Sequence, residues 1–96
     1  MAKGYWMFHV TVNDPDTYQK YIEHDAPVFA RYGGRFLARG GRTTTLEGAP
    51  AGGRVVIVEF PSFERAQEFY NSQEYQAAKQ VRAGAATAQF VLVDGF

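Results

Sequence analysis

Three polar side chains in strand-like segments are the residues best suited to chemistry in this sequence. His9 stands among aromatic and β-branched residues, and an imidazole titrates near neutral pH, so His9 is the candidate catalytic acid or base. Arg39 is a candidate ligand-binding residue, because a guanidinium binds a carboxylate or enolate through two hydrogen bonds. Gly40 and Gly41 follow it and would let a ligand approach the backbone. Glu59 completes this ligand-binding group as the natural counter-charge.

Each of these residues also has a purely structural interpretation. A hydrogen-bonded histidine at the interface between two subunits performs no chemistry. Arg39 can form a salt bridge with Glu59 or Glu47, and the paired glycines can simply bend a strand. For Glu59 an ion pair is favoured over the role of general base. The sequence leaves open whether the group surrounds open volume or is consumed by mutual pairing.

Another carboxylate, Asp25, falls within the apolar stripe of an expected helix, an unusual position for a charged group. Pro27 follows closely and favours a kink that would turn Asp25 to the surface. Lys79 and Arg82, near the end of a later helix, are interpreted as capping or surface residues. The tyrosines at helical spacing are interpreted as packing residues with hydroxyls at the rim: Tyr18, Tyr21, Tyr32, Tyr70 and Tyr75.

The elements that must position these side chains follow from residue periodicity and turn residues. Runs rich in aromatic and β-branched residues predict strands over 5–12, 35–46, 54–60 and 87–93. Gly40 and Gly41 interrupt the second strand and indicate a bulge or sharp bend, so that its two halves face differently.

Three side chains that can cap helices mark the helical segments. Asp14 caps a helix that begins at Pro15 and ends at Gly33 and Gly34, with a kink or break near residues 24–26 and two short helical pieces as the alternative. Ser62 caps a second helix and Ser72 a further short one. The resulting β-α-β-β-α-β order predicts an α+β, ferredoxin-like fold, with helices on one face of a four-stranded antiparallel sheet. Its 96 residues are expected to form a single domain, 1–96.

Helices on one face of the sheet divide each strand into covered and uncovered residues, because successive side chains point to opposite faces. The covered set is apolar and contains Trp6, Phe8, Val10 and Val12; Phe36 and Ala38; Val56, Val58 and Phe60; and Phe90 and Leu92. The uncovered set is mixed and contains Tyr5, Met7, His9 and Thr11; Leu37 and Arg39; Val55, Ile57 and Glu59; and Gln89, Val91 and Val93. Such a face favours burial against a second copy, which predicts a homodimeric barrel with a small-molecule cavity between the two sheets.

Composition excludes several classes of function. Ten basic and ten acidic residues give a net charge of zero, which argues against nucleic acid as a partner. The sequence contains no cysteine, which fits the cytoplasm, and no apolar run long enough to span a membrane. The paired glycines do not stand between a strand and a helix, and the histidines and carboxylates lack a metal-ligand spacing. We therefore expect no cofactor and no metal.

Several short motifs carry a resemblance to a known family. They are GYW at 4–6, the Asp14-Pro15 turn with Tyr18, YGGRFLARGG at 32–41, LEG at 46–48, EFPS at 59–62 and SQEYQ at 72–76. Together they resemble the domain of unknown function 1330 family over essentially the whole chain. The resemblance implies a dimeric α+β barrel, in the superfamily of cofactor-free monooxygenases, muconolactone isomerase and stress-response barrel proteins. It implies no particular reaction and no catalytic residues.

Two functional hypotheses follow. The first is a non-catalytic homodimer that binds a small molecule or has a stress-related or structural role. The alternative is a cofactor-independent isomerase or monooxygenase that acts on a small aromatic or carbonyl compound, with His9 as acid or base and Arg39 as anion clamp.

Overall fold

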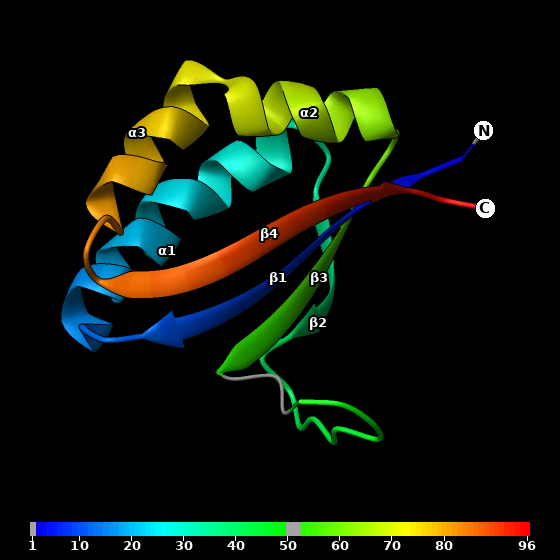
Figure 1. Cartoon of the computed structure of the whole chain (residues 1–96). Helices are drawn as coiled ribbons and strands as arrows, with labels where there is room; N and C mark the ends of the chain where they lie inside the picture. Colours follow the sequence, from blue (N-terminus) through cyan, green and yellow to red (C-terminus); the bar gives the residue numbers. More distant parts are fainter. Residues whose placement is uncertain (1, 50–52) are drawn as a thin grey trace.

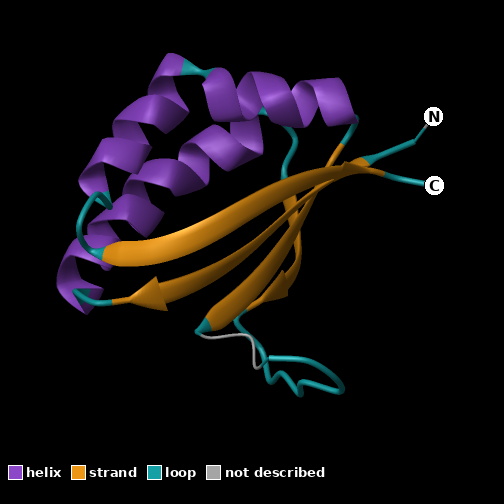
Figure 2. Cartoon of the chain, viewed as in Figure 1, coloured by secondary structure: helices purple, strands orange, loops and turns teal. Residues whose placement is uncertain are grey.

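The described residues of the chain form a four-stranded antiparallel sheet with three helices on one face (Figure 1; Figure 2). This computed structural model describes residues 2–49 and 53–96. The elements are β1 (Gly4–Val12), α1 (Pro15–Arg31), β2 (Arg35–Arg39), β3 (Arg54–Phe60), α2 (Phe63–Asn71), α3 (Gln73–Val81) and β4 (Ala86–Asp94), and the strand order is β2-β3-β1-β4. The ferredoxin-like α+β fold predicted from the sequence is confirmed. No helix in these described parts is long and apolar enough to cross a membrane.

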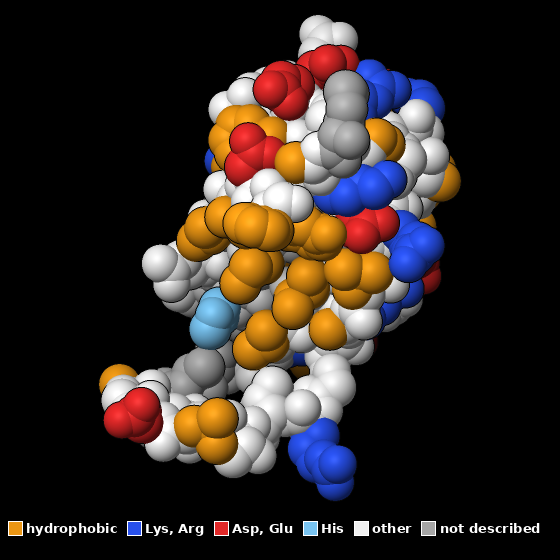
Figure 3. All heavy atoms as spheres, turned by 90° about the vertical axis from the view of Figure 1, so that its right-hand side faces the viewer, with side chains coloured by type: hydrophobic (Ala, Val, Ile, Leu, Met, Phe, Trp, Pro, Cys, Tyr) orange, Lys and Arg blue, Asp and Glu red, His pale blue; other side chains and the backbone are white. Residues whose placement is uncertain are grey.

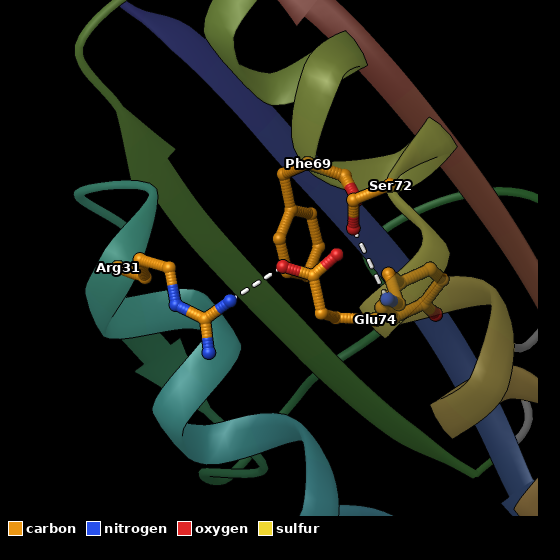
Figure 4. A network of polar contacts seen from close by, with 5 residues as sticks. Arg31, Phe69, Ser72 and Glu74 are labelled. Carbon is orange, nitrogen blue, oxygen red and sulfur yellow. Dashed lines mark hydrogen bonds and ion pairs between the residues drawn. The ribbon is translucent and has the colours of Figure 1, made fainter.

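The predicted capping residues begin all three helices. Asp14 accepts a hydrogen bond from the amide of Thr17, and Ser62 caps α2 through the amide of Arg65. Ser72 separates α2 from α3. Its hydroxyl oxygen accepts a hydrogen bond from the amide of Tyr75, at 3.1 Å, and so caps α3 (Figure 4). The chain therefore changes direction between α2 and α3 without leaving the layer of helices.

A surface ion pair joins two of these helices. Arg31 in the last turn of α1 pairs with Glu74 in the first turn of α3, in the view of Figure 4. Each charge also suits the end of the helix that carries it. Both side chains are well exposed, so the pair contributes little to stability compared with the packing beneath it.

Pro27 does not break α1, so the expected break and the alternative of two short helical pieces are wrong, whereas the expected kink stays a prediction. The helix runs unbroken from Pro15 to Arg31, with Pro27 on its exposed side. A proline removes only one helical hydrogen bond, whereas the inward stripe of α1 is buried both before and after it. That packing holds the helix on the sheet and keeps its face constant along its length.

The core is an aromatic cluster between the sheet and the helices. Trp6 lies at its centre, with its ring centroid 5.0 to 5.5 Å from those of Phe8, Phe29, Phe69, Tyr75 and Phe90. Tilted, edge-on and offset contacts of this kind add to the free energy gained by burying the rings. The covered face predicted for β1, β3 and β4 is the face that is buried here.

The second strand departs from its expected course. It ends at Arg39, so the predicted extension to residue 46 is wrong; the segment 41–49 instead extends away from the sheet (Figure 1). The expected bulge lies earlier than the glycines, between Phe36 and Ala38, where Leu37 is the extra residue. An extra residue reverses the alternation of side chains for the rest of the strand. The part of the predicted loop at 50–52 lies outside the described residues.

The unbroken helix gives a test of the packing argument. Pro27→Ala should raise the free energy of unfolding by about 1–3 kcal/mol, because alanine restores the missing hydrogen bond at an exposed helical position. Chemical denaturation measures this change. Ala30→Gly, also exposed on α1, is the control and should lower the same free energy by about 1 kcal/mol. A loss of stability in the Pro27 variant would mean that the proline is needed for the helix to pack.

Candidate functional site

His9 and Glu59 lie on the uncovered face of the sheet, as predicted, but apart from each other. His9 is paired in register with Val55, whereas Glu59 is paired with Tyr5, four residues away along β1. At about 3.3 Å per residue this separates them by roughly 13 Å along the strand. The Tyr5 hydroxyl lies 3.4 Å from Glu59 Oε2. Within one chain the two residues therefore do not form a common site.

We call this uncovered side of the sheet the open face. Hydrophobic side chains gather on it, as Figure 3 shows, with charged groups toward its margins. Its exposed apolar members include Met7, Val91 and Val93, which are 38 to 48% exposed. Exposed apolar patches on proteins are often sites of interaction with another molecule.

Arg39 does not share the open face with His9, contrary to expectation. The bulge pairs Arg39 with Val56, a buried residue beneath the helices, and turns Ala38 toward the open face instead. The Arg39 guanidinium lies 4.3 Å from the centre of the Phe36 ring, which also faces the helices. Arg39 therefore stands on the opposite face of the sheet from His9 and Glu59, so the expectation that all three belong to the uncovered face is wrong for Arg39.

The paired glycines after Arg39 differ from each other. Gly40 has a φ of +70°, and a Cβ atom there would lie 2.1 Å from Nε of Arg54. Gly40 therefore gives the Arg54 side chain room to cross the backbone. A Cβ atom on Gly41 would meet no atom within 4 Å among the described residues. Their predicted contacts with a ligand remain a prediction.

A cavity lies on the helix side of the sheet, beneath α1. It is partly open and holds about 30 Å³, room for about one or two water molecules. Its walls come from α1 and from β1, β2 and β3: Phe8, Tyr18, Tyr21, Ile22, Asp25, Ala26, Phe29, Phe36, Arg39, Arg54 and Val56. A single carboxylate and two guanidinium groups thus meet in an otherwise mainly apolar and aromatic wall.

Asp25 is the chemically distinctive residue of this cavity. Its side chain is directed inward from α1, it is 2% exposed, and Oδ1 has no hydrogen-bond partner among the described residues. Burial raises the pKa of Asp25 from the ordinary 3.8 to about 7, against the opposing effects of Arg82 and of a hydrogen bond from Tyr21. The carboxyl group therefore gains and loses a proton near neutral pH, as a general acid or base must.

A chain of buried polar groups continues from Asp25 into the core. The hydroxyl oxygens of Tyr21 and Tyr75 are 3.1 Å apart, and Nη2 of Arg82 lies 3.5 Å from the Tyr75 oxygen. Burial raises the pKa of both tyrosines, so both hydroxyls stay protonated near neutral pH. Arg82 thus supplies positive charge that acts on Asp25, and the two tyrosines connect the two groups.

Sequence reasoning misassigned these groups although their spacing carried a signal. Asp25 follows Tyr21 by four residues, which places both on one face of a helix, and Arg82 follows Tyr75 by seven. The expected surface position of Asp25 is wrong, because α1 is not broken at Pro27. Arg82 is the C-cap residue of α3, as the capping interpretation expected, but it is buried and is not a surface residue. The hydroxyls of Tyr21 and Tyr75 lie in the core rather than at its rim.

A second and larger cavity, of about 370 Å³, lies between α2 and the sheet. The described residues that line it include no carboxylate and no imidazole: Trp6, Ala66, Gln67, Tyr70, Asn71, Phe90 and Leu92. It offers amide groups and aromatic surface but no acid or base that titrates near neutral pH. In the described parts of the chain, no cluster of three or more potential metal ligands is present.

The geometry can now be compared with known proteins. The family model for a domain of unknown function (DUF1330) matches residues 3–96. The chain belongs to this family. The resemblance seen in the sequence motifs is thereby confirmed, and no curated protein matches the chain.

Solved structures similar to this DUF1330 chain share its fold at low sequence identity. RPA0582, a protein of unknown function from Rhodopseudomonas palustris, has a TM-score of 0.77 and 22% identity, over 99% of this chain and 83% of that one. SnoaB, a cofactor-independent oxygenase from Streptomyces nogalater, has a TM-score of 0.69 and 16% identity, over 97% and 92%. A dimeric ferredoxin-like protein of unknown function from Thermobifida fusca has a TM-score of 0.59 and 15% identity, over 97% and 89%.

The raised pKa of Asp25 makes stability depend on pH. The folded state holds a proton that the unfolded state releases, so this contribution is present below pH 3.8 and is lost as pH rises toward about 7. The loss amounts to at most roughly 4 kcal/mol, at 1.36 kcal/mol per pKa unit. Urea denaturation from pH 4 to pH 8 measures the free energy of unfolding. The unmodified protein should lose this contribution as pH rises, and the Asp25→Asn variant should not.

Glu23→Gln is the matched control, because Glu23 is an exposed carboxylate on the same helix. The difference in unfolding free energy between this variant and the unmodified protein should change little with pH. A pH profile for Asp25→Asn that runs parallel to that of the unmodified protein would show that Asp25 is not protonated in the folded state.

Proposed function

We propose that this protein binds a small carbonyl compound at the cavity beneath α1, where Asp25 transfers a proton to or from the bound molecule. The observation that carries the proposal is the unpaired Oδ1 of a carboxyl group that is almost fully buried in the cavity wall. An unsatisfied buried polar atom lowers stability, and such atoms concentrate where a protein handles a ligand. This is the cofactor-independent enzyme of the sequence hypotheses, with Asp25 as its acid or base.

The surroundings of Asp25 fit proton transfer better than a structural role. A structural carboxylate in a core is normally paired directly with a cation, whereas no salt bridge of Asp25 is present among the described residues. Tyr21 and Tyr75 instead connect the carboxyl group to Arg82. The positive charge of Arg82, at the end of this series of polar groups, stabilises the carboxylate that forms when Asp25 gives up its proton.

The reaction can be written without a cofactor. The Asp25 carboxylate takes a proton from a carbon next to a carbonyl group, the electron pair of the C–H bond moves into an enolate, and Asp25 becomes a carboxylic acid. In a β,γ-unsaturated ketone the enolate is conjugated with the C=C bond, and return of the proton to the γ-carbon moves that double bond and completes an isomerisation. Addition of dioxygen as a co-substrate to the enolate carbon, followed by protonation of the peroxide, gives a hydroperoxide instead. The second route is supported by the shared fold of SnoaB, a cofactor-independent oxygenase.

The volume of the cavity limits what reaches Asp25. About 30 Å³ admits a group no larger than the methyl group beside the carbonyl, while the rest of the ligand must lie toward the opening. The aromatic walls, which include Tyr18 and Phe36, exclude water around that group. Exclusion of water strengthens the electrostatic interactions on which proton transfer depends.

Proton exchange tests this function directly. Deuterium uptake at the carbons next to the ketone of 4-oxopentanoate is measured by NMR in D₂O, with and without protein. The protein should accelerate uptake, and Asp25→Asn should reduce the protein-catalysed rate by about 10²- to 10⁴-fold, the usual contribution of a general base. Glu23→Gln should retain it. Uptake at the buffer rate across a set of methyl ketones, or full activity in the Asp25 variant, would contradict the proposal.

A second candidate site involves two copies of the chain. We infer that the open face is a self-association surface, because Met7, Val91 and Val93 form an exposed apolar patch on it. The Thermobifida fusca protein, which has a similar fold and is dimeric, supports this inference. A partner seated there would enclose His9 and Glu59 in a cavity between two sheets, where His9 is the proposed acid or base.

Val91→Glu should convert a dimer to monomer, because a carboxylate in an apolar interface loses its hydration without gaining a partner. Sedimentation velocity measures the change. Leu46→Glu is the control, since Leu46 is 89% exposed in the segment outside the sheet and should leave the dimer intact. His9→Ala should fold and dimerise normally but lose binding of any ligand held between the two sheets, while the cavity beneath α1 is unaffected; loss of the dimer would make His9 a structural residue.

A further inference from the structure

Two arginines stand at the opening of the cavity beneath α1. Arg39 at the end of β2 and Arg54 at the start of β3 both line it, and both extend from the side of the sheet that faces the helices. Arg39 is exposed and Arg54 is half-buried. Burial raises the pKa of Tyr18, and the charges of Arg54 and Arg39 act against that rise, so both charges act on the cavity wall.

Neither arginine is neutralised by a carboxylate in the described chain. The two salt bridges there are Arg31–Glu74 and Arg65–Glu68, and both lie on the helices. Arginines on protein surfaces commonly pair with nearby acidic groups, so two unneutralised ones at one opening attract an anion. The single carboxylate in the cavity, Asp25, is deeper and is held largely neutral below pH 7 by its burial.

The backbone at the end of β2 leaves room for both arginines on one side of the sheet. Gly40 takes a φ of +70°, and a Cβ atom there would lie 2.1 Å from Nε of Arg54, so the absence of a side chain at Gly40 accommodates Arg54 in its observed position. The bulge at Leu37 turns Arg39 to this side of the sheet. Both guanidinium groups therefore line the same cavity.

We propose that the molecule bound at this cavity is a small keto acid, whose carboxylate lies between Arg39 and Arg54 while its ketone reaches Asp25. The assignment rests on the proposed function and specifies its substrate class. Guanidinium groups bind a carboxylate through paired, charge-assisted hydrogen bonds, which fix its direction as well as its position. The arginines at the opening then bind the carboxylate of the ligand, and the small cavity admits the end that carries the ketone.

A matched pair of probes tests this assignment. Binding of 4-oxopentanoate and of 4-oxopentanamide, which has nearly the same shape without the charge, is measured by NMR titration at pH 7. The acid should bind about tenfold to a hundredfold more tightly than the amide, the ratio expected for charge-assisted hydrogen bonds. Arg39→Gln and Arg54→Gln should each reduce this ratio to near one. Thermal unfolding of each variant verifies that it is folded.

Arg35→Gln is the matched control. Arg35 belongs to the same strand as Arg39, but it stands opposite Glu59 in the strand register and therefore faces the open side of the sheet. It should keep the full preference for the acid. Equal binding of acid and amide to the unmodified protein, or an unchanged ratio in both cavity variants, would overturn the carboxylate assignment.

The same titrations separate this assignment from the proton-transfer function. Asp25→Asn should keep the preference for the acid, because both arginines are intact, while losing deuterium exchange. Exchange that persists in this variant would overturn the role of Asp25 and leave the carboxylate assignment standing. Binding of neither probe to the folded protein would overturn both.

Discussion

Burial of one aromatic face of the sheet beneath three helices is the constraint on which the rest of this structure depends. Trp6 and the rings around it fill the space between the layers, so α1 must keep one face inward along its whole length. Asp25 lies on that face. Its carboxyl group is therefore held in an apolar environment by packing on both sides, and its raised pKa is a consequence of the fold.

The two faces of the sheet have separate roles in this account. On the helix side, a carboxyl group that titrates near neutral pH is connected through two tyrosines to Arg82, and two further arginines stand at the opening. On the open face, apolar side chains are exposed and form a surface suited to a second copy. Such a division lets self-association stabilise a small domain without obstructing the cavity beneath α1.

Much of the fold can be predicted from the sequence, because strict alternation identifies the buried faces of β1, β3 and β4 and the capping side chains locate the helices. The position of Arg39 could not be predicted in the same way. One extra residue at Leu37 reverses the alternation, and the paired glycines suggested a later bulge. The sequence marked Asp25 as unusual, but the helix-breaking tendency of Pro27 predicted that Asp25 turns to the surface. Tertiary packing keeps α1 continuous instead, and Asp25 stays buried.

The protonation of Asp25 is the central claim, because the proposed proton transfer depends on a carboxyl group that titrates near neutral pH. The most direct measurement is the ¹³C chemical shift of the Asp25 side-chain carboxyl carbon, followed by NMR from pH 3 to pH 9 and assigned by its absence in Asp25→Asn. The midpoint is expected at about pH 7. A midpoint near the ordinary value of 3.8 would show that the carboxylate is charged throughout the neutral range and would contradict the account.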